Sequence, residues 1–221
     1  MKKLIKAILV PLIFLWSKIY SYDLSLWLRE IKDILYTLWI RNSFGKIGPH
    51  TSIHYPCYLE GGGSNKVIIG DYSSLSSHVI IGCHVMYEAY NEKGVVEEQH
   101  FTPEIIIGDN CSIGEYTHLT ACKRIVIGNG LLTGRYVYIG DNSHGSHSKD
   151  EAGIIPARRR IQSKGEISIG NNVWIGDKVT ILGNVTIGNN VIVGANSVVT
   201  HDVPSNCIVA GIPAKIVKTL E

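Results

Sequence analysis

The chain has 221 residues, enough for one large domain or for one domain with an appendage. Its formal net charge of +2 gives no electrostatic basis for binding nucleic acid, so no such partner is expected. The five cysteines are an odd number without a CxxC pair, a pattern that fits neither a zinc site nor a secreted disulfide framework. We therefore expect a cytoplasmic protein without a metal.

Residues 1–44 differ from the rest of the chain and are predicted to be helical. The apolar run from Ala7 to Trp16 has about ten residues, fewer than the roughly 20 that a helix needs to cross a bilayer. It resembles the apolar part of a signal peptide, but no cleavage motif of small residues follows it. The next segment carries apolar residues at helical spacing, namely Leu24, Trp27, Leu28, Ile31, Ile34, Leu35 and Leu38.

Two interpretations of this segment stay open. The helices could pack on the end of the main domain or on a neighbouring subunit, where they would cover an exposed sheet edge. They could instead attach the protein to the inner face of the cytoplasmic membrane, with Lys2, Lys3 and Lys6 near anionic lipids.

From residue 69 onward, a large aliphatic residue recurs at every sixth position, with two interruptions. Neither an α-helix nor a simple strand has this period. It is typical of a hexapeptide β-helix, in which three units form one triangular coil of about 18 residues. We therefore predict an all-β solenoid in which Ile169 stacks against Ile187, and Ile175 against Val193. The predicted inward positions are Ile69, Leu75, Ile81, Ile107, Ile113, Leu119, Ile127, Thr133, Ile139, Ile169, Ile175, Ile181, Ile187, Val193 and Val199.

The predicted solenoid covers residues 45–205, and residues 206–221 form a C-terminal tail that turns back over the last coils. The segments 83–104 and 145–166 interrupt the repeat and are expected to leave one corner as irregular loops. Loops of this length in compact domains are usually functional. The spacing of eight between Leu119 and Ile127 predicts a bulged corner near Cys122 to Arg124.

The repeat identifies an architecture and not a function, so a non-catalytic scaffold stays open. Histidines are the candidates for acid–base chemistry, because imidazole titrates near neutral pH. His144 ends a six-residue unit just before the second interruption. His118 also ends a unit and is the second candidate for a base, and His147 in the loop could contact a substrate.

Four motifs carry a resemblance to a known family: DNSHG (141–145), IGNNVWIGDKVTILGNVTIG (169–188), VIVGANSVVTHDVP (191–204) and VAGIPAKIVK (209–218). With them, residues 45–218 resemble the hexapeptide-repeat acyltransferases, in particular the galactoside, maltose and xenobiotic acetyltransferases and the polysaccharide O-acetyltransferases. The resemblance implies a left-handed parallel β-helix, an exception to the usual right-handed crossover. It also implies a homotrimer that transfers acetyl from acetyl-CoA to a sugar hydroxyl.

The resemblance also assigns roles to residues. The family's catalytic base is a His at the last position of a hexapeptide, which matches His144. The backbone N–H of Asp177 would stabilise the oxyanion, in a direct transfer without a covalent intermediate. The implied coenzyme A contacts are Trp174, Asp177, Ala195, Thr200, His201, Lys215 and Lys218. The acceptor candidates near the corner facing His144 are His118, Thr120, Arg124 and Arg135.

A second enzymatic function stays open beside O-acetylation of a sugar. N-acetylation of an amino sugar, or of a small-molecule antibiotic, would use the same fold and the same acetyl donor. The apolar N-terminus favours an acceptor from surface-glycan synthesis at the membrane. A serine acetyltransferase is disfavoured, because that family carries a much larger helical domain than these forty residues.

Overall fold

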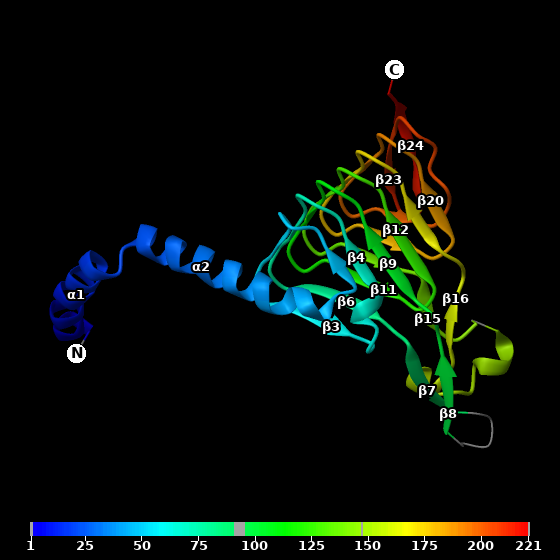
Figure 1. Ribbon diagram of the computed structural model, residues 1–221, viewed down its shortest axis with the longest axis horizontal. Helices are drawn as coiled ribbons and strands as arrows, with labels where there is room; N and C mark the ends of the chain where they lie inside the picture. The colour runs from blue at the N-terminus through cyan, green and yellow to red at the C-terminus, as the bar shows by residue number, and fades with distance from the viewer. Residues whose placement is uncertain (1, 91–95, 147, 221) are drawn as a thin grey trace.

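The repeat region forms a triangular prism of parallel strands in the computed structural model, which describes residues 2–90, 96–146 and 148–220 (Figure 1). Each coil contributes one short strand to each of three faces, called sheets A, B and C. Sheet A contains β1 (Lys46–Ile47), β4 (Val67–Ile69), β9 (Glu104–Ile107), β12 (Arg124–Ile127), β17 (Ile167–Ile169) and β20 (Val185–Ile187).

Sheets B and C complete the prism, and the chain ends in a hairpin added to sheet B. Sheet B contains β2 (Ser52–Ile53), β5 (Ser74–Leu75), β10 (Ser112–Ile113), β13 (Leu132–Thr133), β18 (Trp174–Ile175), β21 (Ile192–Val193), β23 (Cys207–Gly211) and β24 (Ala214–Thr219). Sheet C contains β3 (Cys57–Glu60), β6 (Val79–Cys83), β11 (His118–Ala121), β14 (Tyr138–Gly140), β19 (Thr180–Leu182) and β22 (Val198–Val199). The predicted solenoid is thereby confirmed.

The interior of the prism is filled by the predicted inward residues. Ile169 pairs with Ile187 and Ile175 with Val193 on successive coils, as the six-residue period requires. Thr133, the polar member of the series, is buried, and its hydroxyl accepts a hydrogen bond from the backbone N–H of Gly114 at 2.7 Å. A hydroxyl is tolerated inside the prism because it has this partner.

The corners are built from residues that accept the left-handed backbone conformation. Asn172, Asn190 and Asn206 have φ between 56° and 59° at equivalent corners, and Asn tolerates this region better than most residues. Side chains of one coil also cap backbone N–H groups of the coil before it. The Asn129 side chain, for example, accepts from the N–H of Asp109 at 2.8 Å. These corner hydrogen bonds tie neighbouring coils together.

The two interruptions of the repeat leave the same corner of the prism, but they are more regular than expected. Residues 83–104 contain an antiparallel hairpin of β7 (Met86–Tyr90) and β8 (Val96–His100). The second interruption follows β15 (Asn142–His144) and contains two 3-10 turns (Lys149–Glu151 and Pro156–Arg158). The chain then returns in β16 (Ile161–Ser163), which pairs with β15 in an antiparallel ladder. The prediction of irregular loops is wrong here, because both segments form local antiparallel ladders that a search for six-residue repeats does not detect.

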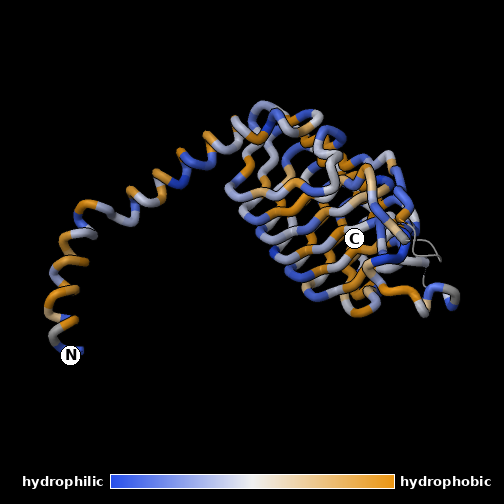
Figure 2. Tube along the Cα trace, turned by 90° about the horizontal axis from the view of Figure 1, so that it is seen from below, coloured by the Kyte–Doolittle hydropathy of each residue, from blue (hydrophilic) through white to orange (hydrophobic). Residues whose placement is uncertain are grey.

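Two helices precede the prism and extend away from it (Figures 1 and 2). They are α1 (Lys2–Ile19) and α2 (Tyr22–Ile40), followed by a 3-10 turn (Arg41–Ser43). The last turns of α2 dock on the first coil, where the Thr37 hydroxyl bonds the backbone of Ile53 and the Tyr36 hydroxyl bonds the backbone of Cys57. Among the described residues neither helix is long and apolar enough to cross a membrane, although the bent pair meets that test of length and composition.

Candidate active site

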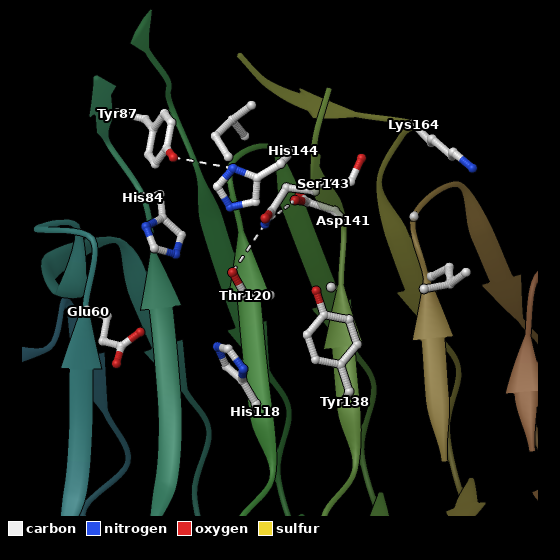
Figure 3. A pocket seen from close by; sticks show the side chains of 15 residues that line it. Glu60, His84, Tyr87, His118, Thr120, Tyr138, Asp141, Ser143, His144 and Lys164 are labelled. Atoms are coloured by element: carbon white, nitrogen blue, oxygen red, sulfur yellow. Dashed lines mark hydrogen bonds between the residues drawn. The ribbon is translucent and has the colours of Figure 1, made fainter. Parts of the chain in front are cut away.

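A pocket of about 620 Å³ opens where the strands of sheet C end, beside the two hairpins (Figure 3). Because parallel strands end at one edge, residues far apart in sequence meet there. The lining residues are Glu60, His84, Tyr87, His118, Thr120, Tyr138, Gly140, Asp141, Asn142, Ser143, His144, Ile161, Lys164, Leu182 and Gly183. Three imidazoles, two phenols and a threonine hydroxyl make the lining rich in hydrogen-bonding groups.

Two glycines keep the floor of this pocket open. Gly82 and Gly140 flank Thr120 on neighbouring strands of sheet C, in one row of the ladder. A Cβ at Gly82 would lie 2.8 Å from Nε2 of His84, and a Cβ at Gly140 would overlap the hydroxyl of Tyr138. The missing side chains therefore leave room for these two polar groups at the floor.

His118 presents an unused hydrogen-bonding atom to this pocket. Its Nε2 is buried and has no hydrogen-bond partner within the described part of the chain. Burial lowers the pKa of His118, and His84 lowers it further, while Glu60 raises it. The ring is therefore neutral at neutral pH and packs edge-on against Tyr138, with ring centroids 5.5 Å apart. A buried polar atom without a partner is costly, so a ligand that pairs with it is favoured.

His144 at the end of β15 is held by a residue of the other hairpin. The Tyr87 hydroxyl donates its proton to the carbonyl of Ala157 at 3.0 Å and lies 3.3 Å from Nδ1 of His144. Because a phenol has one proton, the bond to Nδ1 requires the imidazole to be the donor. Nε2 of His144 then carries the free lone pair, which is the state that a general base needs.

A buried carboxylate fixes the strand that leads to His144. Asp141 accepts hydrogen bonds from the three consecutive backbone N–H groups of Cys122, Lys123 and Arg124, at 2.8 to 2.9 Å. These residues form the expected bulge between β11 and β12. The Asn142 side chain extends the network by donating to the Thr120 hydroxyl at 3.1 Å. The long corner is thereby tied to the pocket floor.

The thiols near this pocket are not suited to nucleophilic catalysis. Burial and the Asp141 charge raise the pKa of Cys122 to about 12 and that of Cys83 to about 11. A thiol with such a pKa has almost no thiolate at neutral pH. No cluster of three or more metal-binding side chains occurs among the described residues.

Comparisons with known proteins identify the family. The family description "Bacterial transferase hexapeptide (six repeats)" matches residues 166–201. WbbJ of Escherichia coli K12, named as a lipopolysaccharide biosynthesis O-acetyl transferase, is 31% identical over 201 residues, with 89% of this chain and 90% of WbbJ covered. The chain belongs to the hexapeptide-repeat acetyltransferase family. The predicted family and left-handed β-helix are confirmed, and the protein is an acetyltransferase.

Further members and solved structures agree with this family. The bifunctional protein GlmU of Bifidobacterium adolescentis is 31% identical over 198 residues, and the match spans 83% of this chain and 41% of GlmU. AntD, a Bacillus cereus N-acyltransferase in complex with dTDP and 3-hydroxybutyryl-CoA, shares the fold (TM-score 0.63, 18% identity, 83% and 87% coverage). A Vibrio cholerae hexapeptide-repeat acetyltransferase complexed with acetyl-CoA has a TM-score of 0.51 at 25% identity, with 82% and 74% coverage.

Three of the residues predicted to contact coenzyme A, namely Trp174, Lys215 and Lys218, lie on sheet B, away from the pocket. Trp174 is 51% exposed on β18 and stands in one ladder row with Ile192, Ile208 and Lys218. Two rows further along the final hairpin, Ala210 pairs with Lys215. Trp174 and both lysines thus share sheet B, which joins an apolar surface to positive charge near the C-terminus.

Asp177 and Ala195 occupy the corner between sheets B and C. The Asp177 carboxylate caps the backbone N–H of Arg135 at 2.8 Å, and Ala195 occupies the equivalent position in the next coil. An alanine has no side-chain acceptor, so it cannot cap the N–H of Asp177 in the same way. Thr200 and His201 directly follow β22 of sheet C. The Thr200 hydroxyl lies 2.8 Å from Nδ1 of His201.

Of the four predicted acceptor residues, the structure brings His118 and Thr120 into the pocket with His144. Arg124 and Arg135 do not line it, which corrects their expected position. The Arg124 side chain turns to the other side of the corner and pairs with Glu104 at 2.8 Å. The Arg135 side chain pairs with Glu115 at 3.2 Å, on the corner at the opposite end of sheet C.

Several pocket residues were missed by sequence reasoning. Glu60, His84 and Tyr138 reach the pocket because coils stack in register, and Tyr87 reaches it from a hairpin outside the repeat. The signal that could have found Tyr138 is its place directly before the predicted inward position Ile139 on β14. Glu60 lies before the first predicted inward position and had no such signal. His147 and residues 91–95 lie outside the described residues.

Proposed function

We propose that this acetyltransferase moves an acetyl group from acetyl-CoA to a hydroxyl group of a sugar that belongs to a surface-glycan precursor. The observation that carries the proposal is the state of His144, whose Nδ1–H is engaged by Tyr87 and whose Nε2 is free at a pocket rich in polar groups. A pocket with several hydrogen-bonding side chains set among apolar surface suits a polyhydroxylated acceptor such as a sugar.

The chemistry is a direct transfer in which His144 acts as general base. Nε2 removes the acceptor's hydroxyl proton while the oxygen attacks the thioester carbonyl carbon. The tetrahedral intermediate then collapses with loss of the carbon–sulfur bond. The coenzyme leaves as a thiol after taking the proton from the imidazolium. The backbone N–H of Asp177, which Ala195 cannot cap, would stabilise the oxyanion.

The proposal includes two chains for each site. In one chain, Asp177 stands before a strand of sheet C, and the pocket lies near Leu182 at the other end of that strand. We propose that coenzyme bound at the corner of Asp177 and Ala195 serves the His144 of a neighbouring chain. A cyclic homotrimer provides this head-to-tail arrangement three times.

The choice of a sugar hydroxyl rests on the named activity of WbbJ, which covers 89% of the chain at 31% identity. Acetylation of an amino sugar is the second candidate, because AntD is an N-acyltransferase crystallised with dTDP and shares the fold. The two candidates use the same base and differ in the acceptor atom.

The test is release of free thiol from acetyl-CoA over a panel of hexoses, amino sugars and nucleotide-linked sugars, with the mass of each product. All five cysteines of the protein are buried, so a thiol reagent reports the coenzyme with little background from the native protein. Turnover with a hydroxyl acceptor is expected, with an alkali-labile ester as product. Turnover confined to amino sugars would overturn O-acetylation, and no release with any acceptor would overturn the proposed reaction.

A further inference from the structure

Helix α1 has two chemically different faces, and neither contacts the prism. At 3.6 residues per turn, all four lysines of α1 (Lys2, Lys3, Lys6 and Lys18) fall within one half of its circumference, together with Ser17. The same half also carries the exposed Val10, Ile13 and Phe14, so it mixes basic and apolar side chains. The other half is apolar and exposed, and it comprises Ile5, Ile8, Leu9, Leu12, Leu15, Trp16 and Ile19. A soluble helix normally buries such a face.

Helix α2 docks on the prism through the face opposite to its apolar stripe. Asp33 binds the backbone N–H of Tyr55 at 3.0 Å and Nδ1 of His54 at 2.8 Å, and Thr37 binds Ile53. On the far side of the helix, the members of the apolar stripe that stand exposed are Trp27, Leu28, Ile34, Leu35 and Leu38. The polar contacts thus fix α2 so that its apolar stripe faces away from the prism.

We infer that α1 and the α2 stripe form a membrane-binding surface that lies in the plane of one anionic leaflet. The apolar faces would enter the acyl-chain boundary, while the lysines of α1 remain among the headgroups. Residues 1–22 contain no Asp or Glu, so this segment is attracted to anionic lipid and repelled by a second copy of itself. Trp16, Tyr20 and Trp27 are amphipathic aromatic side chains of the kind enriched at membrane interfaces.

The charges of α1 and α2 favour this pose over one that crosses the bilayer. As a bent pair, Ile5–Ile19 and Tyr22–Ser43 meet at 52° and reach the length of a membrane span. A span of about 20 residues that reaches from α1 into α2 would place Lys18 and Asp23 in hydrocarbon, where each ionised side chain is strongly disfavoured. In the interfacial pose these side chains stay in water. This inference does not depend on the acceptor or on the acetyl transfer.

The experiment is co-sedimentation of the full chain with vesicles of phosphatidylcholine alone and of equal parts phosphatidylcholine and phosphatidylglycerol. Trp16→Glu and Ser17→Glu form a matched pair, since the neighbouring residues lie on opposite faces of α1 and the change in charge is equal. We expect binding to the anionic vesicles, a loss of about tenfold or more for Trp16→Glu, and a change within about twofold for Ser17→Glu.

Two further measurements separate this surface from the alternatives. Brominated lipids should quench the fluorescence of the wild-type tryptophans, because three of the four tryptophans of the chain lie on α1 and α2. Failure of the wild type to bind anionic vesicles, or equal losses in both variants, would overturn the inference. Light scattering tests self-association: a mass that drops only with Trp16→Glu would assign the face to a second copy instead. Acetyl transfer to a water-soluble acceptor should survive in both variants.

Discussion

The hydroxyl oxygen of Tyr87 lies 3.3 Å from Nδ1 of His144 and donates its own proton to the carbonyl of Ala157. A residue of the first hairpin thereby sets the tautomer of the imidazole on the second. We predict that Tyr87→Phe lowers kcat by about fivefold to tenfold, the loss expected for one hydrogen bond, and leaves KM for acetyl-CoA unchanged. Steady-state kinetics of thiol release measures both constants.

Tyr72→Phe is the matched control for this substitution. Tyr72 is an exposed tyrosine that stacks on His50 at the corner between β4 and β5, away from the pocket and from the corner of Asp177 and Ala195, so the loss of its hydroxyl should not affect turnover. Equal rates for Tyr87→Phe and the wild type would contradict the assigned hydrogen bond.

His118 predicts a specific dependence of stability on pH. Burial lowers its folded-state pKa below the value of about 6.5 for an unfolded histidine, so between these two pKa values the unfolded chain binds more protons. The stabilising contribution of the neutral ring is therefore complete above about pH 6.5 and is lost progressively as the pH falls from there through the lower folded-state pKa. Urea denaturation at a series of pH values should show a smaller acid-induced loss for His118→Gln than for the wild type.

The difference between the two curves reports the loss of the His118 ring. Parallel curves would refute the assignment of a buried neutral ring. His118→Gln should also raise KM for the acceptor more than KM for acetyl-CoA, because the His118 ring lines the pocket.

Asp141 is predicted to be the main support of the bulged corner. Asp141→Ala leaves three backbone N–H groups without their acceptor and should lower the free energy of unfolding by about 3 kcal/mol. Asp141→Asn keeps one acceptor oxygen and should fall between the wild type and the alanine variant. Denaturant titration of the three proteins gives the order of their free energies of unfolding. An Asp141→Ala protein that is as stable as the wild type would show that the corner does not need the carboxylate.

A site shared between chains predicts complementation between two inactive variants. His144→Ala removes the base, and Ala195→Trp fills the corner proposed for the coenzyme. When the two variants are co-expressed and assemble at random, each site has one chance in two of an intact His144 and one in two of an intact corner. The mixed protein should therefore regain about a quarter of wild-type activity. A mixture that stays inactive would place the whole site within one chain.

The prism could be predicted from the sequence because every coil obeys the same local rule. Each aliphatic residue at the sixth position fills the interior, and so pairs such as Ile169 with Ile187 follow from the period. The face of α2 that docks could not be predicted this way. Its apolar stripe suggested packing on a core, yet the prism binds Asp33 and Thr37, because the exposed backbone of the first coil needs hydrogen-bonding partners.

The candidate site was predictable only in part for a similar reason. His144 and His118 stand at defined positions of the repeat, so the sequence could single them out. Tyr87 and His84 follow the end of a strand whose next coil begins some twenty residues later, and their neighbours depend on how the inserted segment folds. The direction of the Arg124 side chain is set by its ion pair with Glu104, and the spacing of the repeat does not predict that ion pair.

The most direct test of the catalytic assignment is the rate of acetyl transfer by His144→Ala beside His118→Gln, with one acceptor and saturating acetyl-CoA. Removal of a general base should lower kcat by about 100-fold or more, whereas His118→Gln should keep kcat within about tenfold of the wild type. A His144→Ala protein that retains wild-type turnover, or a loss that appears only with His118→Gln, would contradict the assignment and place the base on the pocket floor.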